Sequence, residues 1–312
     1  MSRLFLGVDG GQSSTKALIG DETGRVVGAG SGGPCNHVGA AEGSAKLTAA
    51  VLECVGKACE QASLDPKRVE FEAACFGMSG GPEDKEQLLR RILRAAKFVV
   101  THDALIALSG ATAGEPGIIA IAGTGSIAFG RNASGVTARA GGWGYIFGDE
   151  GGGFDIARQA VRAALRFEEG WGPATTLRDR ILQETGATSA NDALHRFYTA
   201  EYSRPQIASL SRLVDDAATA GDEVSAKILS NAAQQLAMLV AAIRAQLWIT
   251  ATSARIAYIG GVFRSKPLLE RFKMLVEMED GNQCHPPIYD PAAGALLEAY
   301  RIADVRPVKL EY

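Results

Sequence analysis

The stretch LFLGVDGGQSSTKALI, residues 4–19, joins two apolar runs through a glycine-rich polar turn. This pattern is typical of a β-hairpin with a wide bend. A further turn at 21–24 leads to another strand-like run at 26–30. The N-terminus therefore predicts an antiparallel meander that begins the fold.

The same pattern returns in the middle of the chain. It consists, in order, of strand-like residues 117–122, a bend at 123–126, strand-like residues 127–130, a turn at 132–135 and strand-like residues 136–140. A repeated unit constrains the whole fold. The repeat predicts two related domains that meet face to face, each contributing a Gly/Ser/Thr hairpin to one cleft between them.

Helical and strand-like patterns alternate around the two meanders, which predicts an α/β fold. The expected helices are 45–62, 82–96, 104–113, 154–169, 175–184, 191–198, 205–220, 223–249, 267–277 and 292–302, and the expected strands are 69–76, 98–100 and 255–259. Glu115-Pro116-Gly117 marks the change of domain. We expect domains at 1–115 and 116–290, with a C-terminal helix in 291–312 completing the first.

Composition excludes several classes of protein. The chain has 312 residues, of which 46% are hydrophobic and 21% charged, and its net charge is -3. A mildly acidic chain without a Lys/Arg cluster is a poor candidate for binding nucleic acid or an anionic membrane. No apolar run reaches the roughly 18 residues of a membrane span, and no signal peptide is evident. We therefore expect a cytoplasmic protein.

The five cysteines agree with that location. They are scattered and odd in number, with no CxxC pair and no Cys/His cluster at zinc spacing. We expect buried free thiols in a reducing compartment.

The two bends have the residues of a phosphate site. A glycine-rich bend after a strand can present backbone N–H groups to phosphate oxygens, and Asp9 could hold Mg²⁺ through water. Neither bend matches a P-loop, and no Rossmann glycine pattern opens a helix here. Each bend alone could be an ordinary tight turn, but two in matching hairpins favour a phosphate site. The candidate phosphate-binding residues are Gly10, Gly11, Gln12, Ser13, Ser14, Thr15, Gly123, Thr124, Gly125 and Ser126.

Asp103 is the candidate catalytic base. It lies between a strand and a helix, where functional residues of α/β sheets are commonly found. Alternatively, Asp103 is the N-cap of the helix 104–113, and one carboxylate could serve both roles. His102 beside it is expected to pack against or orient its neighbours.

A glycine-rich aromatic segment, GGWGYIFGDEGGG at 141–153, offers close backbone approach, apolar rings and carboxylates. Such a set is suited to a carbohydrate pocket. The alternative is a flexible lid in which Asp149 and Glu150 favour the N-terminus of the next helix.

Two further short motifs are ambiguous when taken alone. Asn36 and His37 could hydrogen-bond to sugar hydroxyls or could belong to an ordinary loop. Gly260 and Gly261 could let a purine lie against the backbone or could form a strand-to-helix turn. Gly294, in the sequence AAGA, would let a helix pack closely on a neighbour.

Taken in order, the motifs DGGQSST, GMSGG, THDA, AGTGS, GGWGYIFGDEG, IGGVF and DPAAGA resemble those of the sugar kinase/actin/heat-shock ATPase superfamily. More closely, they resemble the N-acetylglucosamine kinase branch of the BadF/BadG/BcrA/BcrD ATPase family. The likeness spans essentially the whole chain. It implies two ribonuclease-H-like, actin-like ATPase domains, with ATP and a sugar in the cleft between them.

The resemblance also implies roles for particular residues. Asp103 would be the catalytic base, Gly260 and Gly261 would contact adenosine, and Asp9 would be the metal ligand. The residues that fall at the expected sugar site are Asn36, His37, Ser79, Gly80, Asp103, Thr124, Gly142, Trp143 and Asp149.

The implied reaction is transfer of a phosphoryl group from ATP, with Mg²⁺, to the 6-hydroxyl of an amino sugar, with N-acetylglucosamine favoured. Val38 and Ala140 stand where vertebrate members of the family carry an aromatic residue and a cysteine, which keeps glucosamine and muramic acid open as substrates. The alternatives without kinase activity are an ATPase activator of a dehydratase or reductase and a sugar sensor. We expect a homodimer whose partners are ATP and the amino sugar.

Overall fold

The structure is a computed structural model. It describes residues 3–11, 13–35, 41–78, 85–199, 201–249, 252–305 and 309–312. Contacts divide the chain into two compact units: unit 1 comprises 1–115 with 287–312, and unit 2 comprises 116–286.

The chain returns to unit 1 earlier than the sequence suggested. Residues 287–290 were grouped with the second domain, but they pack in unit 1. The reason is backbone pairing, because the N–H groups of Ile288 and Tyr289 donate to the carbonyls of Ala111 and Gly110 at 3.1 and 3.0 Å.

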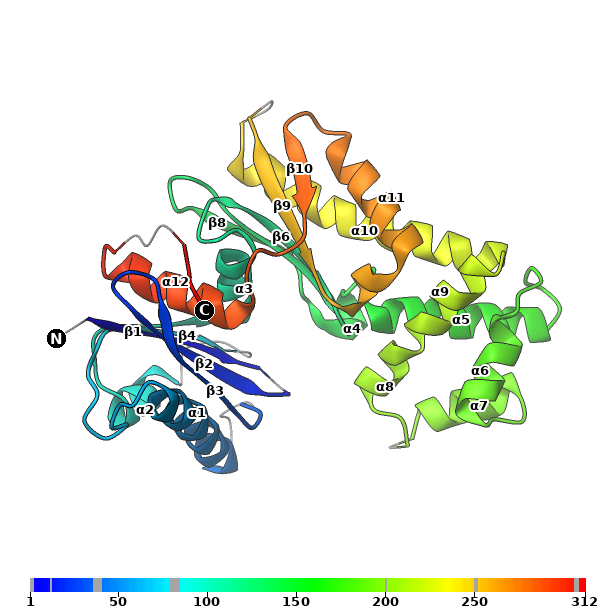
Figure 1. Cartoon of the computed structure of the whole chain (residues 1–312). Coiled ribbons are helices and arrows are strands. Elements are labelled where there is room, and N and C mark those ends of the chain that lie inside the picture. The colour runs from blue at the N-terminus through cyan, green and yellow to red at the C-terminus, as the bar shows by residue number, and fades with distance from the viewer. Residues whose placement is uncertain are drawn as a thin grey trace. The chain divides into compact units, whose positions relative to one another are not determined.

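Unit 1 is built on a five-stranded sheet in the order β3-β2-β1-β4-β5 (Figure 1). Its strands are β1 (Leu4–Gly10), β2 (Thr15–Asp21), β3 (Val26–Gly32), β4 (Phe71–Met78) and β5 (Ala95–His102). The first three pair antiparallel, which confirms the predicted meander, and β1, β4 and β5 run parallel.

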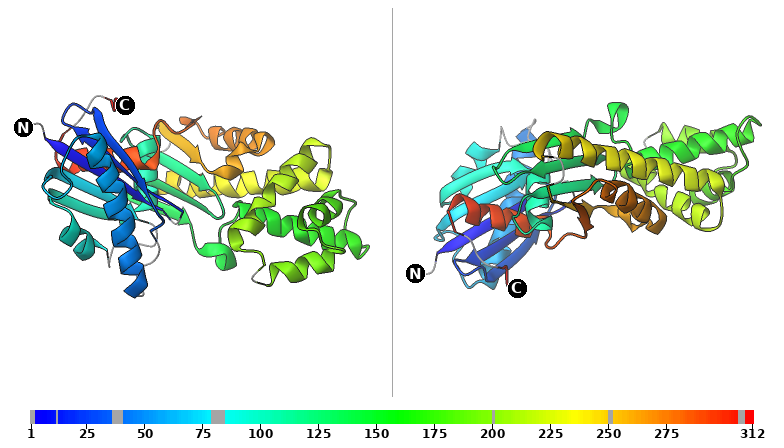
Figure 2. Two further views of the ribbon diagram at one scale, coloured as in Figure 1. Left: turned by 60° about the horizontal axis from the view of Figure 1, so that its bottom comes forward. Right: turned by 90° about the horizontal axis from the view of Figure 1, so that it is seen from above.

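Helices cover both faces of this sheet, where they bury two separate apolar clusters. One face carries α1 (Ala41–Gln61), which runs along the sheet in Figure 2, and α2 (Glu86–Ile92). The other carries α3 (Asp103–Ala111) and α12 (Pro291–Ile302). A Cβ at Gly294 of α12 would lie 1.8 Å from the carbonyl oxygen of Ile106 in α3. This confirms the predicted close helix packing, which only glycine allows here.

Unit 2 repeats the topology of unit 1 with the strand order β10-β9-β6-β7-β8. Its strands are β6 (Gly117–Ala122), β7 (Ser126–Arg131), β8 (Thr137–Gly141), β9 (Ala254–Ile259) and β10 (Asn282–His285). As in unit 1, the first three form an antiparallel meander and the later two run parallel to its first strand. The predicted repeat and the α/β class are therefore confirmed.

The helices of unit 2 bury one large apolar cluster with its sheet. They are α4 (Gly144–Phe147), α5 (Gly153–Glu168), α6 (Leu177–Thr185), α7 (Ala190–Phe197), α8 (Arg204–Ser209), α9 (Ser211–Thr219), α10 (Glu223–Leu247), the 3₁₀ turn η1 (Gly261–Arg264) and α11 (Lys266–Glu277). Among the described segments, α10 alone is long and apolar enough to cross a membrane. Its buried side chains Leu236, Val240 and Ile243 belong to the core of unit 2, so α10 reads as a core helix.

Two predicted helices were wrong in extent. The helix expected at 82–96 ends at Ile92, because Leu93 is extended and residues from Ala95 onward form β5; residues 82–84 lie outside the described part of the chain. The helix expected at 205–220 is divided at Leu210 into α8 and α9. The strand β10 was not expected, since its sequence NQCH lacks an apolar run.

The cysteines are free thiols, as expected. Cys35, Cys54, Cys59 and Cys75 are buried, whereas Cys284 is only partly buried. Burial raises the pKa of all five thiols, which keeps them protonated and poorly reactive.

Candidate functional site

The bend of unit 1 follows β1 and closes the β1–β2 hairpin. The Gly11 N–H donates to the Ser14 carbonyl at 3.0 Å, and the Cys35 N–H donates to the Gly11 carbonyl at 2.9 Å. The Thr15 hydroxyl donates to the Gly33 carbonyl at 2.7 Å. These bonds fix the base of the bend and leave Ser13 and Ser14 exposed.

Carboxylates gather at one edge of the unit 1 sheet. Because β1, β4 and β5 are parallel, their carboxyl ends share an edge, and this edge carries Asp9 near the end of β1 and Asp103 directly after β5. Burial raises the pKa of Asp9 to about 6, and the charges of Asp103 and Asp290 add to the rise while Lys16 opposes it. Lys16 faces Asp9 across the strand pair and lies 3.5 Å from Asp290.

The helix-capping interpretation of Asp103 is wrong. The N-cap of α3 is His102, whose Nδ1 accepts the Leu105 N–H at 3.3 Å, and Asp103 is the first residue of the helix. His102 therefore satisfies the N–H that Asp103 was expected to bind. The Asp103 side chain is exposed, which leaves its carboxylate accessible to a substrate.

The bend of unit 2 is bonded closely to the segment that follows β8. Every one of these bonds joins a residue of 123–126 to a residue of 142–154. They run from Gly153 N–H to Gly123 O (2.8 Å), Phe154 N–H to Thr124 O (3.0 Å), Gly142 N–H to Ser126 O (3.0 Å) and Ser126 Oγ to Glu150 O (2.6 Å). The backbone of this bend is therefore held by the aromatic segment.

A cavity of about 420 Å³ in unit 2 lies against this bend. It falls within the size range of small-molecule sites. Gly123 and Thr124 from the bend and Gly261 from the end of β9 all line it. The remaining lining residues are Gly153, Ile156, Pro205, Ala208, Ser209, Ser211, Arg212, Asp215, Leu229, Val262, Arg264, Ser265 and Leu268. Apolar walls with hydroxyls and arginines could hold a base or a ribose together with an anionic group.

The paired glycines after β9 have different roles. Gly260 has φ of 119°, and a Cβ there would lie 2.1 Å from the Ala122 carbonyl oxygen, so the fold itself requires this glycine. A Cβ at Gly261 would meet no atom within 4 Å. Gly261 is therefore free to face a ligand, and it also begins the 3₁₀ turn η1, so the turn interpretation is confirmed and the purine contact stays a prediction.

In the aromatic segment 141–153, aromatic rings are exposed to solvent, whereas one of the acidic side chains is buried. Trp143 and Phe147 are 66% and 86% exposed, whereas Asp149 is buried. The Asp149 carboxylate is bound within unit 2, because it accepts the Ser126 N–H at 3.3 Å and pairs with Arg204 at 2.5 Å. It lies against the bend, since a Cβ at Gly125 would be 2.4 Å from one of its oxygens, and the lid interpretation stays a prediction.

Asp155 is an acidic residue in the first turn of α5 itself. The Asp155 carboxylate in the first turn accepts the Gly151 N–H at 3.1 Å. Glu150 contributes its backbone carbonyl to the bend, where it accepts a hydrogen bond from the Ser126 hydroxyl.

Several predicted residues lie outside the part of the chain that the structure describes: Gln12, Asn36, His37, Ser79 and Gly80. Three charged residues that interact with residues at or near the bends were not predicted: Lys16, Asp290 and Arg204. Asp290, the N-cap of α12, precedes a proline at the first helical position, a signal that could have identified it. Lys16 and Arg204 carry no such signal, because strand register and tertiary packing bring them to their partners.

Asp9 is the residue best placed to hold a metal ion. Within the described segments no group of three or more His, Cys, Asp and Glu side chains is arranged to bind one. Mg²⁺, however, is commonly held by one or two carboxylates together with phosphates and water. A cation beside Asp9 would offset the repulsion from Asp103 and Asp290 that raises its pKa, so the residues present fit this ion.

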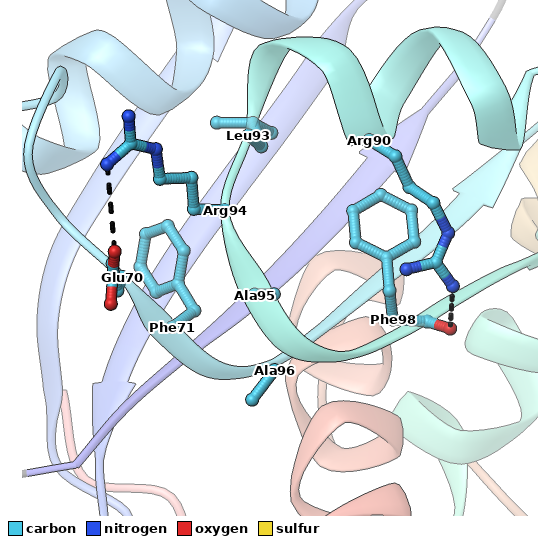
Figure 3. Close-up of a pocket in the computed structure, with 8 residues that line it drawn as sticks. All are labelled: Glu70, Phe71, Arg90, Leu93, Arg94, Ala95, Ala96 and Phe98. Atoms are coloured by element: carbon cyan, nitrogen blue, oxygen red, sulfur yellow. Dashed lines mark hydrogen bonds and ion pairs between the residues drawn. The ribbon is translucent and has the colours of Figure 1, made fainter.

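A second cavity, of about 430 Å³, lies in unit 1 away from these motifs. Figure 3 shows that its charged groups are already engaged. Arg94 pairs with Glu70 at 3.6 Å, while Arg90 lies 4.6 Å from the Phe98 ring centroid and donates to the Phe98 carbonyl. We assign no function to this cavity.

Comparison with known proteins gives a consistent picture. The model of the BadF/BadG/BcrA/BcrD ATPase family matches residues 6–299. The N-acetylmuramic acid/N-acetylglucosamine kinase of Clostridium acetobutylicum is 36% identical over 270 residues, which cover 84% of this chain and 86% of that protein. The N-acetyl-D-glucosamine kinase of Dictyostelium discoideum is 30% identical over 311 residues, 95% of this chain and 97% of that one.

A solved structure has the same fold. A protein from Chromobacterium violaceum, described as a candidate N-acetylglucosamine kinase, superposes with a TM-score of 0.74 at 26% identity. The match covers 95% of this chain and 98% of that one.

Proposed function

We propose, from the premise that this chain belongs to the BadF/BadG/BcrA/BcrD ATPase family, that it is an ATP-dependent kinase acting on an amino sugar. One observation carries the proposal beyond family membership. Gly123, Thr124 and Gly261, which come from two motifs far apart in the sequence, line one cavity in unit 2. This cavity would take the adenosine, and the adjoining bend would take phosphate oxygens.

Asp103 is proposed as the base that accepts the proton of the sugar 6-hydroxyl. The exposed carboxylate and the use of His102 as helix cap support this role. Phosphoryl transfer proceeds through a loose transition state, so positioning and electrostatic stabilisation contribute most of the acceleration. The base assists by removing the proton as the new oxygen–phosphorus bond forms.

The phosphates of ATP are proposed to contact both glycine bends. In unit 1 the candidates are Gly10, Gly11 and the residues 13–15, and in unit 2 they are 123–126. Mg²⁺, when bound with ATP, would neutralise charge on the β- and γ-phosphates, and Asp9 would hold it through water.

The amino sugar is proposed to be N-acetylglucosamine. The names of the relatives from Clostridium acetobutylicum and Dictyostelium discoideum support this choice. Gly142 and the exposed ring of Trp143 are suited to pack against a sugar. Asn36, His37, Ser79 and Gly80 remain proposed sugar contacts. Muramic acid and glucosamine stay as alternative substrates, the former because the Clostridium relative is also named for N-acetylmuramic acid.

A coupled assay of ADP release tests the proposal with N-acetylglucosamine, N-acetylmuramic acid, glucosamine, N-acetylmannosamine and glucose. The expected result is sugar-dependent ADP release that is fastest with N-acetylglucosamine, with phosphate found on the 6-oxygen. Binding of a sugar without ADP release would favour a sensor. Sugar-independent ATP hydrolysis would favour an activator. A homodimer and a cytoplasmic location remain predictions, which sedimentation analysis and cell fractionation test.

A further inference from the structure

Arg204, the first residue of α8, reaches back to the aromatic segment. Its Nη2 lies 2.5 Å from Oδ2 of Asp149. Its guanidinium also lies over two aromatic rings, 4.9 Å from the centroid of Tyr145 and 5.9 Å from that of Phe154. The side chain is 38% exposed, so one guanidinium joins a buried acid to rings that are partly open to solvent.

Asp149, the partner of Arg204, in turn contacts the bend at 123–126. Its side chain is only 8% exposed, and one oxygen accepts the Ser126 N–H at 3.3 Å. A Cβ at Gly125 would lie 2.4 Å from the other carboxylate oxygen, so the carboxylate rests directly against the bend. Asp149 also has φ of 62°, a left-handed conformation that is uncommon for residues other than glycine and that its surroundings must hold in place.

These contacts form one chain from α8 to the bend. We propose that Arg204 is a positioning residue, which acts through Asp149 to hold the 123–126 bend in the conformation that binds nucleotide phosphates. This inference rests on the proposed function and deepens it. No sequence motif marks Arg204, which lies 55 residues from its partner.

The physical reason is the cost of an unpaired buried charge. Removal of one partner of a buried ion pair leaves the other uncompensated, and the structure responds by rearrangement or protonation. The Asp149 carboxylate has the bend on one side and Arg204 on the other. Without Arg204 it would turn toward water and release the Ser126 N–H. The backbone N–H groups of the bend would then lose the fixed orientation on which binding of an anion depends.

The phosphate part of a nucleotide should sense this loss most, although Gly123 and Thr124 of the bend and Pro205 of α8 also line the adenosine cavity. The adenosine cavity is lined from other elements as well, including Gly261, Val262 and Leu268, none of which forms a hydrogen bond or ion pair with Asp149. A positioning role for Arg204 therefore predicts a loss that depends on phosphate. A merely structural role predicts an equal loss for every adenine ligand.

The test compares ADP with adenosine by calorimetry on the full chain. In Arg204→Gln we expect the Kd for ADP to rise about tenfold, equivalent to about 1.4 kcal/mol, and the Kd for adenosine to change by less than about twofold. Arg204→Lys should restore part of the ADP affinity, because it keeps a cation beside Asp149. Asp149→Asn should resemble Arg204→Gln, and the double variant should be no weaker than either single one if the two act as a unit.

Arg178→Gln is the matched control. Arg178 lies on α6, is 33% exposed and pairs with Glu168 at 2.8 Å, a pair that makes no contact with the bend. We expect unchanged affinity for both ligands in this variant. Thermal unfolding of every variant distinguishes loss of a contact from loss of the fold.

Two results would overturn the inference: wild-type affinity for ADP in Arg204→Gln, or equal losses for ADP and adenosine. The proposed function fails separately, if the wild type phosphorylates none of the amino sugars while the difference between ADP and adenosine persists. A wild type that binds neither ligand contradicts both.

Discussion

The bends of the two units close the same kind of hairpin, yet their surroundings differ. In unit 1 the bonds around the bend join Gly11 to Ser14 and to Cys35, and Thr15 to Gly33. The charged groups near this bend are Asp9, Lys16 and Asp290. In unit 2 the bend at 123–126 is bonded along its length to the segment 142–154. The bend of unit 1 therefore lies near carboxylates, whereas the bend of unit 2 is held by hydrogen bonds to a neighbouring segment and lies beside a cavity.

This difference indicates a division of labour within a repeated fold. The shared topology fixes where a bend can be placed, at the carboxyl end of the first strand of each sheet. What each bend does depends on the side chains that neighbouring elements bring to it. In the proposed function, unit 1 provides the base and the metal ligand, unit 2 binds the adenosine, and the bends of both units contact the phosphates.

The largest expected effect tests the chemical role of unit 1. Asp103→Asn should lower kcat by about 10²–10⁴, because the amide cannot accept the hydroxyl proton, and should leave the Kd for ADP within about twofold. Steady-state kinetics with a separate binding measurement checks both. The control Glu60→Gln changes another exposed acid of unit 1. A kcat near that of the wild type would remove Asp103 from the role of base.

The next effect concerns the packing of α12 against α3 in unit 1. Gly294→Ala should lower the free energy of unfolding by about 1–3 kcal/mol, because the new methyl would overlap the Ile106 carbonyl oxygen and separate α12 from α3. Urea unfolding measures the change. Gly56→Ala in α1 is the matched control, since its Cβ meets no atom within 4 Å. An unchanged midpoint for Gly294→Ala would contradict the close packing.

A smaller effect tests the role of unit 2 in binding. Gly261→Ala should weaken ADP binding by up to about tenfold, because its methyl would enter the cavity, while thermal stability stays near that of the wild type. Gly260→Ala should instead destabilise the fold, since φ of 119° and the Ala122 carbonyl oppose a side chain there. If Gly261→Ala binds ADP normally, the nucleotide does not approach residue 261.

The smallest effect tests stability in unit 2 away from its bend. Burial alone would raise the pKa of Asp222, but hydrogen bonds from Ser225, Thr176 and Thr175 outweigh it and lower the pKa to about 2 from 3.8. Asp222→Ala removes the N-cap of α10 and should cost about 1 kcal/mol at neutral pH. Asp216→Ala, a change at an exposed acid on α9, should cost little.

The pH dependence of this difference has a definite sign. Because the folded pKa of Asp222 lies below its unfolded value, its contribution is fully present above about pH 4 and is lost as the pH falls toward 2. Urea unfolding at pH 7 and at pH 3 should therefore show a smaller gap between wild type and Asp222→Ala at the lower pH. A gap that widens in acid would contradict the assignment.

Local patterns predicted much of the fold, and failed where contacts at long range decide. The two meanders followed from alternating apolar runs and glycine turns. The short strand β10 was invisible because its residues are polar and pair only with β9. The break at Leu210 was missed because the helical pattern continues through it. The alternative that Asp103 caps the helix was wrong, because His102 occupies that position.

The sequence by itself determined the repeated hairpins and the places of the two bends, because these depend on residues close together in the chain. The tertiary structure alone decided which charges meet. Lys16 reaches Asp290 and Arg204 reaches Asp149 only after strands and helices have packed, since 274 and 55 residues separate the partners. Such pairs carry no local pattern, because their energy depends on burial and distance in the folded chain.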